Sequence, residues 1–253
     1  MADVPARWTD LRRFTSARVA LGRAGNGLPT TAHLEFQAAH AAARDAVHAA
    51  LDVTTLCAEL NAAKLPSIRV QSEAPDRQTY LLRPDLGRRL HDRSAIPAMP
   101  GATLFVVCDG LSATAVQRHA VPLLRHVIPR LSGAIAPIVV AEQGRVALGD
   151  DIGEAMGAAA VAVLIGERPG LSAADSLGVY LTWQPRRGRT DAERNCISNI
   201  RPEGLTPEFA ADKLLWLIDA MRRMQLTGIA LKDEHSQADV ATLEQQQIEA
   251  EPP

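Results

Sequence analysis

Charged and glycine-rich loops follow three short apolar segments in the second half of the chain, and these loops hold the residues with the greatest scope for chemistry. The segment 161–165 ends in Gly166-Glu167-Arg168-Pro169-Gly170, the segment 179–183 precedes a loop with four arginines, and the segment 196–200 ends at Arg201-Pro202. Each segment predicts a strand, and the first is apolar enough to be buried on both faces of a parallel sheet. Because ligands of open α/β sheets bind at the carboxyl ends of strands, we expect the functional site there.

Three motifs at successive strand ends are the leading candidates for a binding site: Gly144-Arg145-Val146, Glu167-Arg168 and Asn195-Cys196. Together they offer an apolar contact, a carboxylate acceptor and a small polarizable sulfur, which suits one face of a large cofactor. Cys196 is a poor candidate for a nucleophile. A cysteine hydrolase needs a histidine base beside the thiol, and none of the seven histidines can be placed there from the sequence.

The motif Cys108-Asp109-Gly110-Leu111-Ser112 follows a predicted strand at 103–107. Ser112 can cap the next helix, and Gly110 fits a tight turn. These structural roles leave Asp109 unexplained, since it lies where a buried sheet delivers polar groups to solvent or ligand. A functional and a structural interpretation of Asp109 both stay open.

Two N-terminal patterns invite a functional interpretation that their spacing does not support. The glycines of residues 22–27 match neither a P-loop nor GxGxxG and follow no strand, so we predict a structural turn, with Arg18 and Arg23 free to meet an anion or a partner chain. Further along, three histidines lie on one face of a predicted helix, but their spacing separates them by about 10 Å, too far for one metal ion. We expect a polar face, solvated or docked on a partner, formed by His33, Gln37, His40, Arg44 and His48.

Composition excludes several classes of protein. The chain has 253 residues and a formal net charge of -2, so it lacks the basic excess typical of a nucleic-acid surface. Its three cysteines form no CxxC pair, which indicates a reducing compartment and no metal site. No apolar segment is long enough to span a membrane, and the N-terminus lacks the apolar core of a signal peptide. We expect a cytoplasmic protein with no nucleic-acid or membrane partner.

The pattern of apolar residues divides the chain near residues 97–101. Before this point it is mainly helical, and after it strands and helices alternate at a spacing typical of a mostly parallel sheet with right-handed crossovers. We predict an α/β fold: a helical N-terminal region (1–100), a Rossmann-like domain with helices on both faces (101–232) and a polar, disordered tail (233–253). The predicted helices are 30–51, 53–63, 84–90, 113–128, 152–156 and 207–225, and the predicted strands are 68–71, 103–107, 135–140, 161–165, 179–183 and 196–200.

Several ungapped blocks resemble one protein family. GERPG at Gly166, DSLGVYLTW at Asp175 and RTDAERNCISNI at Arg189 are similar to the small (light) subunit of adenosylcobalamin-dependent ethanolamine ammonia-lyase. The resemblance covers about residues 17–232, because further blocks match in the same order: ARVALGRAGNGLPT at Ala17, HAAARDAVHAALD at His40, TYLLRPDLGRRL at Thr79, CDGLSATAV at Cys108 and EQGRVALGDDIGE at Glu142.

The resemblance implies a function and three site residues. Small subunits of this family help to hold adenosylcobalamin at the interface with a large, TIM-barrel subunit, and the holoenzyme splits ethanolamine into acetaldehyde and ammonia by radical chemistry. The family's cobalamin contacts fall on Val146 in QGRVAL, Glu167 in GERPG and Cys196 in RNCISN. Val146 would pack against the cofactor, Glu167 would accept hydrogen bonds from its amides or ribose, and Cys196 would be in close contact. For Glu167, an ion pair with Arg168 or a neighbouring arginine is the structural alternative.

The resemblance also implies that this chain carries no catalytic residue and no cobalt ligand. Cobalamin binders that displace the cofactor's own base share a DxHxxG loop, whose nearest match here is Asp233-Glu234-His235 with Ala238 in place of the glycine. This match lies in the polar tail, with no apolar strand before it. We therefore expect base-on binding, and we expect the catalytic residues on the large subunit.

Two other functions stay open: a self-sufficient nucleotide-dependent α/β enzyme and a purely structural partner subunit. The absence of GxGxxG after the strand at 103–107 counts against the first. Adenosylcobalamin affinity, measured with and without the large subunit, would distinguish all three. Family members that enter bacterial microcompartments can carry an N-terminal extension. About sixteen residues precede the first matching block here, which favours the free cytoplasm over a microcompartment.

Overall fold

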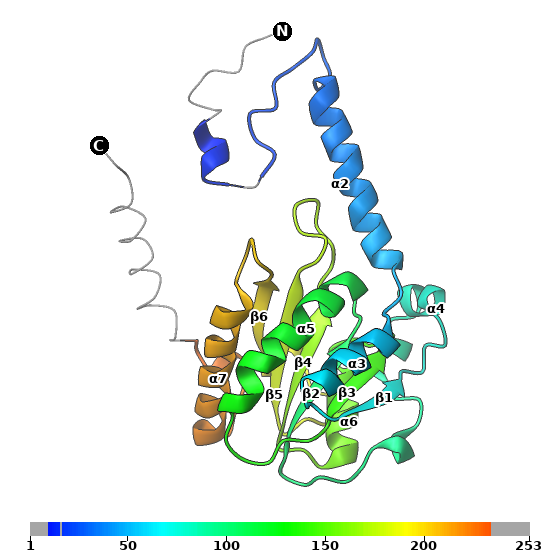
Figure 1. Ribbon diagram of the computed structural model, residues 1–253, viewed down its shortest axis with the longest axis vertical. Coiled ribbons are helices and arrows are strands. Elements are labelled where there is room, and N and C mark those ends of the chain that lie inside the picture. Colours follow the sequence, from blue (N-terminus) through cyan, green and yellow to red (C-terminus); the bar gives the residue numbers. More distant parts are fainter. Residues whose placement is uncertain (1–9, 16, 234–253) are drawn as a thin grey trace, which may run out of the picture.

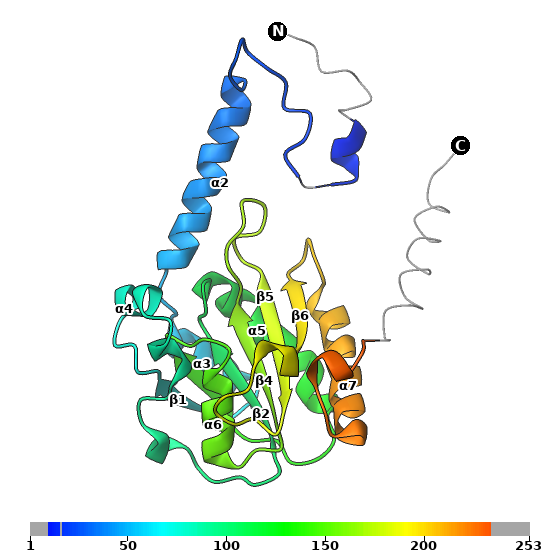
Figure 2. The ribbon, with the colours of Figure 1, turned by 180° about the vertical axis from the view of Figure 1, so that it is seen from behind.

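The computed structural model describes residues 10–15 and 17–233, which form a six-stranded sheet with helices on both faces (Figures 1 and 2). This arrangement confirms the predicted α/β class. The strands are β1 (Ser67–Gln71), β2 (Thr103–Cys108), β3 (Ile138–Glu142), β4 (Ala160–Gly166), β5 (Leu177–Trp183) and β6 (Asn195–Ile200). The α-helices are α2 (Thr30–His48), α3 (Val53–Ala62), α4 (Arg77–Leu82), α5 (Ala113–Val127), α6 (Leu148–Met156) and α7 (Pro207–Met224), and the short 3-10 helices include η2 (Leu86–Arg88) and η5 (Asp191–Glu193).

The strand order is β1-β3-β2-β4-β5-β6, and of these strands β5 alone runs against its neighbours. The loop 167–176 that joins β4 to β5 contains no helix, whereas a parallel crossover needs about a dozen or more residues and usually a helix. The carboxyl end of β5 therefore lies at the amino end of β4, where Trp183 pairs with Ala160. Our expectation that all three loops lie at one edge of the sheet was wrong for the loop after β5.

The two faces of the sheet are covered by different elements. The helices α3, α5 and α7 cover one face (Figure 1), and α6 covers part of the other (Figure 2). Both β2 and β4 are buried along their whole length, as their continuous apolar sequences predict. On β5 and β6, by contrast, the face on the α6 side is less covered, and Cys196 and Ser198 are exposed there.

Helix α6 approaches the sheet closely because two of its residues are glycines. A Cβ added at Gly149 would collide with the Val163 side chain of β4, and one added at Gly153 would collide with Pro185. The helix also buries two carboxylates, Asp150 and Asp151, in its first turn. Since buried carboxylates need partners, α6 fixes the position of the arginine-rich loop after β5 as well as that of the sheet.

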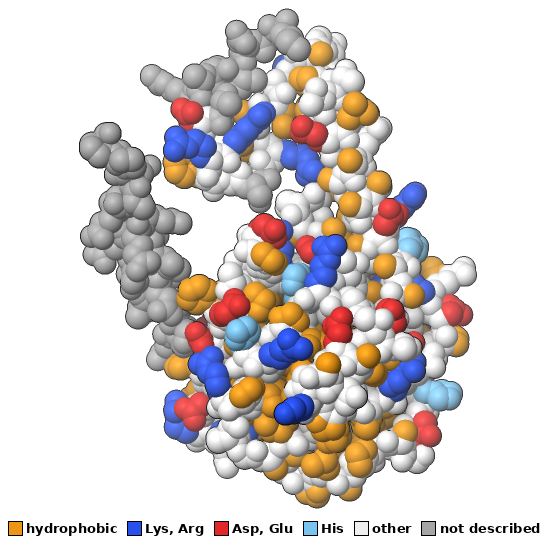
Figure 3. All heavy atoms as spheres, in the orientation of Figure 1, with side chains coloured by type: hydrophobic (Ala, Val, Ile, Leu, Met, Phe, Trp, Pro, Cys, Tyr) orange, Lys and Arg blue, Asp and Glu red, His pale blue; other side chains and the backbone are white. Residues whose placement is uncertain are grey.

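Helix α2 projects away from the sheet (Figures 1 and 2). It buries only Ala32 and Ala46, and the backbone near its carboxyl end is held by a hydrogen bond of 2.8 Å from Arg77 Nε to the Val47 carbonyl. It ends at His48 rather than at the predicted residue 51, because Asp52 already caps α3 by accepting from the Thr55 N–H. Hydrophobic side chains are visible along the projecting helix in Figure 3.

The segment between α3 and β2 differs from its prediction in two places. The helix predicted at 84–90 is the single turn η2, and the helix α4 was not predicted. Asp76 caps α4 through the Thr79 N–H at 2.7 Å, and Pro84 follows its end. The strand β1, which we did predict, pairs with β3 and so belongs to the same sheet as the later strands. The boundary near residue 100 stays a prediction, and the predicted disordered tail lies almost wholly outside the described residues.

None of the described helices is long and apolar enough to cross a membrane.

The contact between α6 and β4 can be tested with a double-mutant cycle. Gly149→Ala should lower the free energy of unfolding by about 1–3 kcal/mol through overpacking, less the roughly 1 kcal/mol that alanine gains in helix propensity. Val163→Ala opens space for the new methyl group, so the double variant should be more stable than the sum of the two single effects by about 1 kcal/mol. Urea titration of the four proteins measures this. Additivity to within about 0.5 kcal/mol would contradict the contact.

Candidate functional site

The face of β5 and β6 beside α6 carries the exposed part of the site. Tyr180 of β5 pairs with Cys196 of β6, and the alternation of side chains along β6 places Ser198 on the same face as Cys196. Ile197 points to the opposite face, where it joins the core under α7. Figure 2 shows no helix in front of the part of β5 and β6 next to the carboxyl end of β4. This open surface of the sheet is available to a ligand or a partner.

The loop between β3 and α6 borders this surface and presents Val146 to it. Both backbone polar groups of Gly144 are held: its N–H donates to Asp109 Oδ1 at 3.0 Å, and its carbonyl accepts from the Tyr80 hydroxyl at 3.0 Å. A Cβ at Gly144 would lie 2.8 Å from the Cys108 Cβ, so the loop contacts the end of β2 directly. The position of Val146 therefore depends on Asp109 and Tyr80.

Tyr80 is fully buried and lies between two arginines. The guanidinium carbons of Arg77 and Arg145 lie 4.9 Å and 4.3 Å from its ring centroid. A Cβ at Gly87 would lie 2.9 Å from the same ring, and the Gly87 carbonyl accepts from the Arg145 N–H at 2.8 Å. Cation–π contacts with a desolvated ring are among the stronger of their kind. The stacking fixes the direction of the Arg145 side chain.

Asp109, whose role the sequence left open, holds this arrangement together. Its carboxylate accepts from Gly144 N–H and, through Oδ2, from Arg77 Nη1 at 3.1 Å, and it is 1% exposed. Burial raises its pKa to about 6, against the opposing influence of Arg77. These partners, Arg77 and Gly144, belong to the chain itself. Asp109 therefore has a structural role: it positions the loop that carries Val146. The predicted roles of Gly110 and Ser112 are also confirmed: Gly110 has φ +54°, and Ser112 caps α5 through the Ala115 N–H.

Glu167 directly follows β4, as predicted, but it pairs with no arginine among the described residues. Its carboxylate accepts from the Ser176 hydroxyl, from the Ser198 hydroxyl at 2.5 Å and from the Asn199 N–H at 3.2 Å. These bonds join the ends of β4, β5 and β6. An ionised carboxylate offers about four acceptor positions, so one position on Oε1 is still free.

Glu167 is located by a contact between two stretches of backbone. A Cβ at Gly166 would collide with the carbonyl oxygens of Asp109 and Ser112, and a Cβ at Gly110 would collide with the Gly166 carbonyl. The Leu111 N–H donates to the Gly166 carbonyl at 2.9 Å. The end of β4 thus crosses the turn between β2 and α5 without a side chain between them.

Cys196 is the second residue of β6 and so lies near the amino end of its strand, which corrects our placement of it at a strand end equivalent to that of Glu167. Because β6 runs in the same direction as β4, the amino end of β6 is not at the edge that carries Glu167, and Cys196 pairs with Tyr180 in the middle of β5. Local burial of the thiol raises its pKa, and its hydrogen bond with Tyr180 does not reverse this effect. A neutral thiol fits a contact residue rather than a nucleophile.

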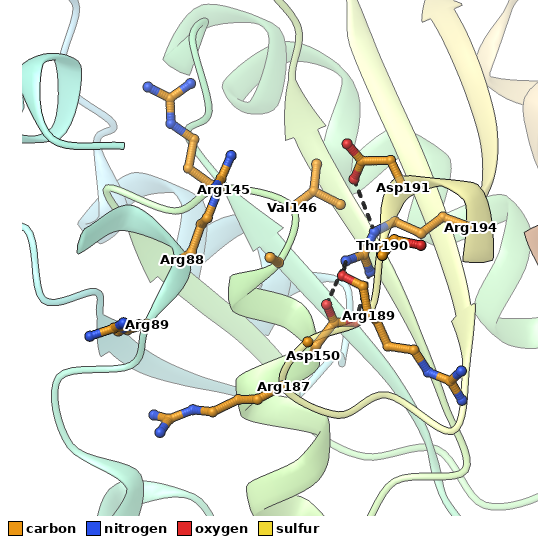
Figure 4. Close-up of a pocket in the computed structure, with 12 residues that line it drawn as sticks. Arg88, Arg89, Arg145, Val146, Asp150, Arg187, Arg189, Thr190, Asp191 and Arg194 are labelled. Atoms are coloured by element: carbon orange, nitrogen blue, oxygen red, sulfur yellow. Dashed lines mark hydrogen bonds and ion pairs between the residues drawn. The ribbon is translucent and has the colours of Figure 1, made fainter. Parts of the chain in front are cut away.

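Two pockets border the open sheet surface. One, of about 240 Å³, is lined by Val146, Glu167 and Tyr180, and Cys196 lies next to its Tyr180 wall. The second, of about 630 Å³, also has Val146 in its wall (Figure 4). The three residues singled out by the resemblance therefore lie around one region of the surface. Tyr180, which we did not single out, joins them; a tyrosine within the mostly apolar segment 177–183 was the available signal.

The arginine-rich loop after β5 has a structural explanation. Arg194 is buried and binds Asp150 of α6 at 2.6 Å and 2.8 Å, and Arg187 binds Asp151 at 2.7 Å. Arg189 pairs with Glu193, whose carboxylate also completes the cap of η5. These ion pairs fasten the loop along α6, where the buried carboxylates require them.

The N-terminal patterns agree with their structural interpretations. Residues 22–27 form a tight turn in which Ala24 and Gly27 exchange backbone hydrogen bonds, so the predicted turn is confirmed. On α2, His33 and Gln37 are hydrogen-bonded at 2.9 Å and His40 contacts the Phe36 ring. Within residues 10–15 and 17–233, no group of three or more histidine, cysteine or carboxylate side chains could hold a metal ion.

The raised pKa of Asp109 predicts a pH effect on stability. The folded chain, with a pKa of about 6, retains a proton that the unfolded chain, with a pKa of 3.8, has released, so stability should fall as the pH rises from about 4 to about 6. The shift corresponds to about 3 kcal/mol. Asp109→Asn does not titrate, so urea titrations across this range should give a flatter curve. The exposed Asp85, whose pKa is lowered by Arg83, provides the control: Asp85→Asn should keep the wild-type slope. Parallel curves for wild type and Asp109→Asn would contradict the assignment.

Comparison with known proteins identifies the family of the chain. A model of the ethanolamine ammonia-lyase light chain family matches residues 5–232. Proteins named ethanolamine ammonia-lyase small subunit are similar along almost their whole length: one from Pseudomonas fluorescens is 53% identical over 248 residues (94% of this chain, 89% of that protein). One from Azotobacter vinelandii is 54% identical over 248 residues (94% and 91%), and one from Bradyrhizobium diazoefficiens is 53% identical over 242 residues (91% and 92%). The resemblance inferred from the sequence blocks is confirmed: the chain belongs to the ethanolamine ammonia-lyase small-subunit family.

Proposed function

We propose that this chain, in complex with an ethanolamine ammonia-lyase large subunit, helps to bind adenosylcobalamin at the subunit interface for the conversion of ethanolamine to acetaldehyde and ammonia. The observation that carries the proposal is the open sheet surface of β5 and β6, around which Val146, Glu167 and Cys196 lie. We propose the cytoplasm as its location, with a bacterial microcompartment within it as the alternative.

The side chains at this surface fit a large ligand with an apolar body and amide edges. Val146 and the Tyr180 ring offer apolar contact, and the free acceptor position of Glu167 suits an amide N–H or a hydroxyl. Arg145 has a buried Nε with no hydrogen-bond partner among the described residues, so the site also holds unused donors. When bound, adenosylcobalamin supplies a cobalt–carbon bond whose homolysis starts radical chemistry. The chain's own residues bind and orient it.

The base-on mode is supported by the residues around the site. Neither pocket is lined by a histidine, so no imidazole of the described chain is placed to bind cobalt there. The match to DxHxxG begins at Asp233, and the rest of it lies outside the described residues. We propose that the cofactor keeps its own dimethylbenzimidazole ligand.

A non-catalytic role is supported by the state of the carboxylates. The buried carboxylates of Asp109, Asp150 and Asp151 are each bound by an arginine, and Glu167 is occupied by two hydroxyls and an N–H. General acid–base catalysis needs a group free to exchange its proton with a substrate. These groups hold loops in place instead, which fits catalytic residues on the large subunit.

The alternative of a self-sufficient nucleotide enzyme finds little support at the amino end of α5. The N–H groups of Leu111, Ser112 and Ala115 donate to Gly166, Asp109 and Ser112, so they are not available to a phosphate. A purely structural subunit, with no ligand contact, is distinguished from our proposal by experiment. Its prediction is that adenosylcobalamin affinity of the complex does not depend on Glu167.

We predict that Glu167→Gln lowers the adenosylcobalamin affinity of the assembled enzyme by about tenfold to a hundredfold, since a lost charged hydrogen bond costs about 1.5–3 kcal/mol. Thermal stability should also fall, because the NH2 group of glutamine cannot accept the hydrogen bonds made to the carboxylate oxygen that it replaces, whereas Glu167 accepts through both of its oxygens. Titration of the cofactor into wild-type and mutant complexes, with thermal melts of each, separates the two effects.

Ser176→Ala is the matched control for this experiment. It removes one hydrogen bond to Glu167 from a buried hydroxyl and leaves the carboxylate in place. We expect a lower melting temperature and a cofactor affinity close to that of wild type. A normal affinity in Glu167→Gln, with a lowered melting temperature, would remove Glu167 from the site.

The N-terminal segment is our candidate for part of the large-subunit interface, together with α2 and its histidines. Five of the ten exposed large hydrophobic residues in the described chain precede residue 37, and the core begins only at Ala32. Exposed apolar side chains gathered on one projection are typical of a surface that a partner covers. These side chains are Leu11, Phe14, Leu28, Leu34 and Phe36.

Deletion of residues 1–30 should therefore weaken association with the large subunit while the α/β domain stays folded. No described residue of this segment belongs to the core, so the melting transition of the free subunit should persist. Co-purification with a tagged large subunit, alongside circular dichroism of the free chain, measures both outcomes. Unchanged co-purification would refute this assignment.

A further inference from the structure

The larger of the two pockets is lined by six arginines, and four of them are already paired. Arg187, Arg189 and Arg194 bind the carboxylates of Asp151, Glu193 and Asp150, and Arg89 lies 4.0 Å from Glu73. Arg88 and Arg145 make no ion pair with any of the described residues. Both are drawn at the same end of the pocket in Figure 4, with Val146 between them and Arg194. This end of the pocket has positive charge without a counter-ion among the described residues.

The Arg145 side chain is held in a position from which it can bind an anion. Its guanidinium is stacked on the buried Tyr80 ring at 4.3 Å. Of its donors, Nε is buried without a partner, and Nη2 makes a single long bond of 3.4 Å to the Tyr80 carbonyl. An arginine offers five N–H donors in a planar fork that matches the oxygens of a phosphate. A side chain fixed by stacking, with most donors unused, loses little conformational freedom when an anion binds.

The arginine end is continuous with the site for the proposed cofactor. Arg145 and Val146 line both pockets, so an anion at Arg145 lies beside the surface on which Val146, Glu167 and Tyr180 meet. Adenosylcobalamin carries one anionic group under its corrin ring, the phosphodiester of the nucleotide loop. The unpaired positive charge of Arg145 lies next to Val146. It therefore matches the single anionic group of a ligand whose amide edges are neutral.

We propose that Arg145, assisted by Arg88, binds the phosphodiester of the cobalamin nucleotide loop. This inference rests on the proposed function. It adds a recognition element: the chain distinguishes a complete cobalamin from a corrinoid that lacks the nucleotide loop. The competing hypothesis is that these arginines bind a carboxylate of the large subunit. In that case, replacing Arg145 or Arg88 would weaken subunit association instead of cofactor binding.

The test compares two ligands on the assembled complex of both subunits. Adenosylcobalamin carries the phosphodiester, and adenosylcobinamide lacks the nucleotide loop. Affinity is measured by equilibrium dialysis with absorbance detection for wild type, Arg145→Gln, Arg88→Gln and the control Arg89→Gln, whose arginine pairs with Glu73. Arg88 is exposed, so its replacement keeps the test valid if Arg145→Gln disturbs the packing on Tyr80.

We expect Arg145→Gln to weaken adenosylcobalamin binding by about tenfold to a hundredfold and Arg88→Gln to weaken it less, with adenosylcobinamide affinity unchanged in both. Arg89→Gln should change neither affinity. Equal losses for the two ligands, no loss for either, or weaker subunit association without ligand would each overturn the inference. Failure of the proposed function gives a separate result: the wild-type complex then binds adenosylcobalamin no better than the large subunit alone.

Discussion

The buried Asp109 carboxylate is the interaction on which the rest of the site depends. It joins Gly144 of the loop before α6 to Arg77 of α4, and Tyr80 of the same helix holds Gly144 from its other side. Burial works against the charge, yet the charge is retained near neutral pH because three segments of chain donate to it or surround it. A helix from the N-terminal region thereby fixes a loop of the α/β sheet.

The reversal of β5 is what leaves a surface for a ligand. A further parallel strand would have required a crossover helix, and such a helix would cover the face that β5 and β6 leave open. The short loop 167–176 avoids this helix and brings Ser176 back to Glu167. Long side chains on the open face are few, so that face is shaped by Tyr180, Cys196 and Ser198. The open surface therefore results from the strand topology, and the side chains then determine its chemistry.

The helices and strands were predicted well from the sequence where local signals were strong. The prediction was less successful for features that depend on tertiary contacts. The continuous apolar segments gave β2 and β4, and the Ser112 cap gave the start of α5. The direction of β5 was missed because strand orientation is set by the connection and not by the strand's own residues. Asp109 could not be assigned, since its partners Arg77 and Gly144 lie 32 and 35 positions away. Glu167 was placed correctly, but its serine partners carry no sequence signal.

The crossing of Gly110 and Gly166 has a consequence for how this protein can change over time. Backbone touches backbone there, so the location of Glu167 relative to the core does not depend on which side chains fill that core. Leucines, valines and isoleucines beneath the crossing can be exchanged for one another at constant volume while the carboxylate stays where it is. The two glycines have no such freedom. Substitutions are thus tolerated in the interior but not at Gly110 and Gly166, although neither glycine carries a functional group.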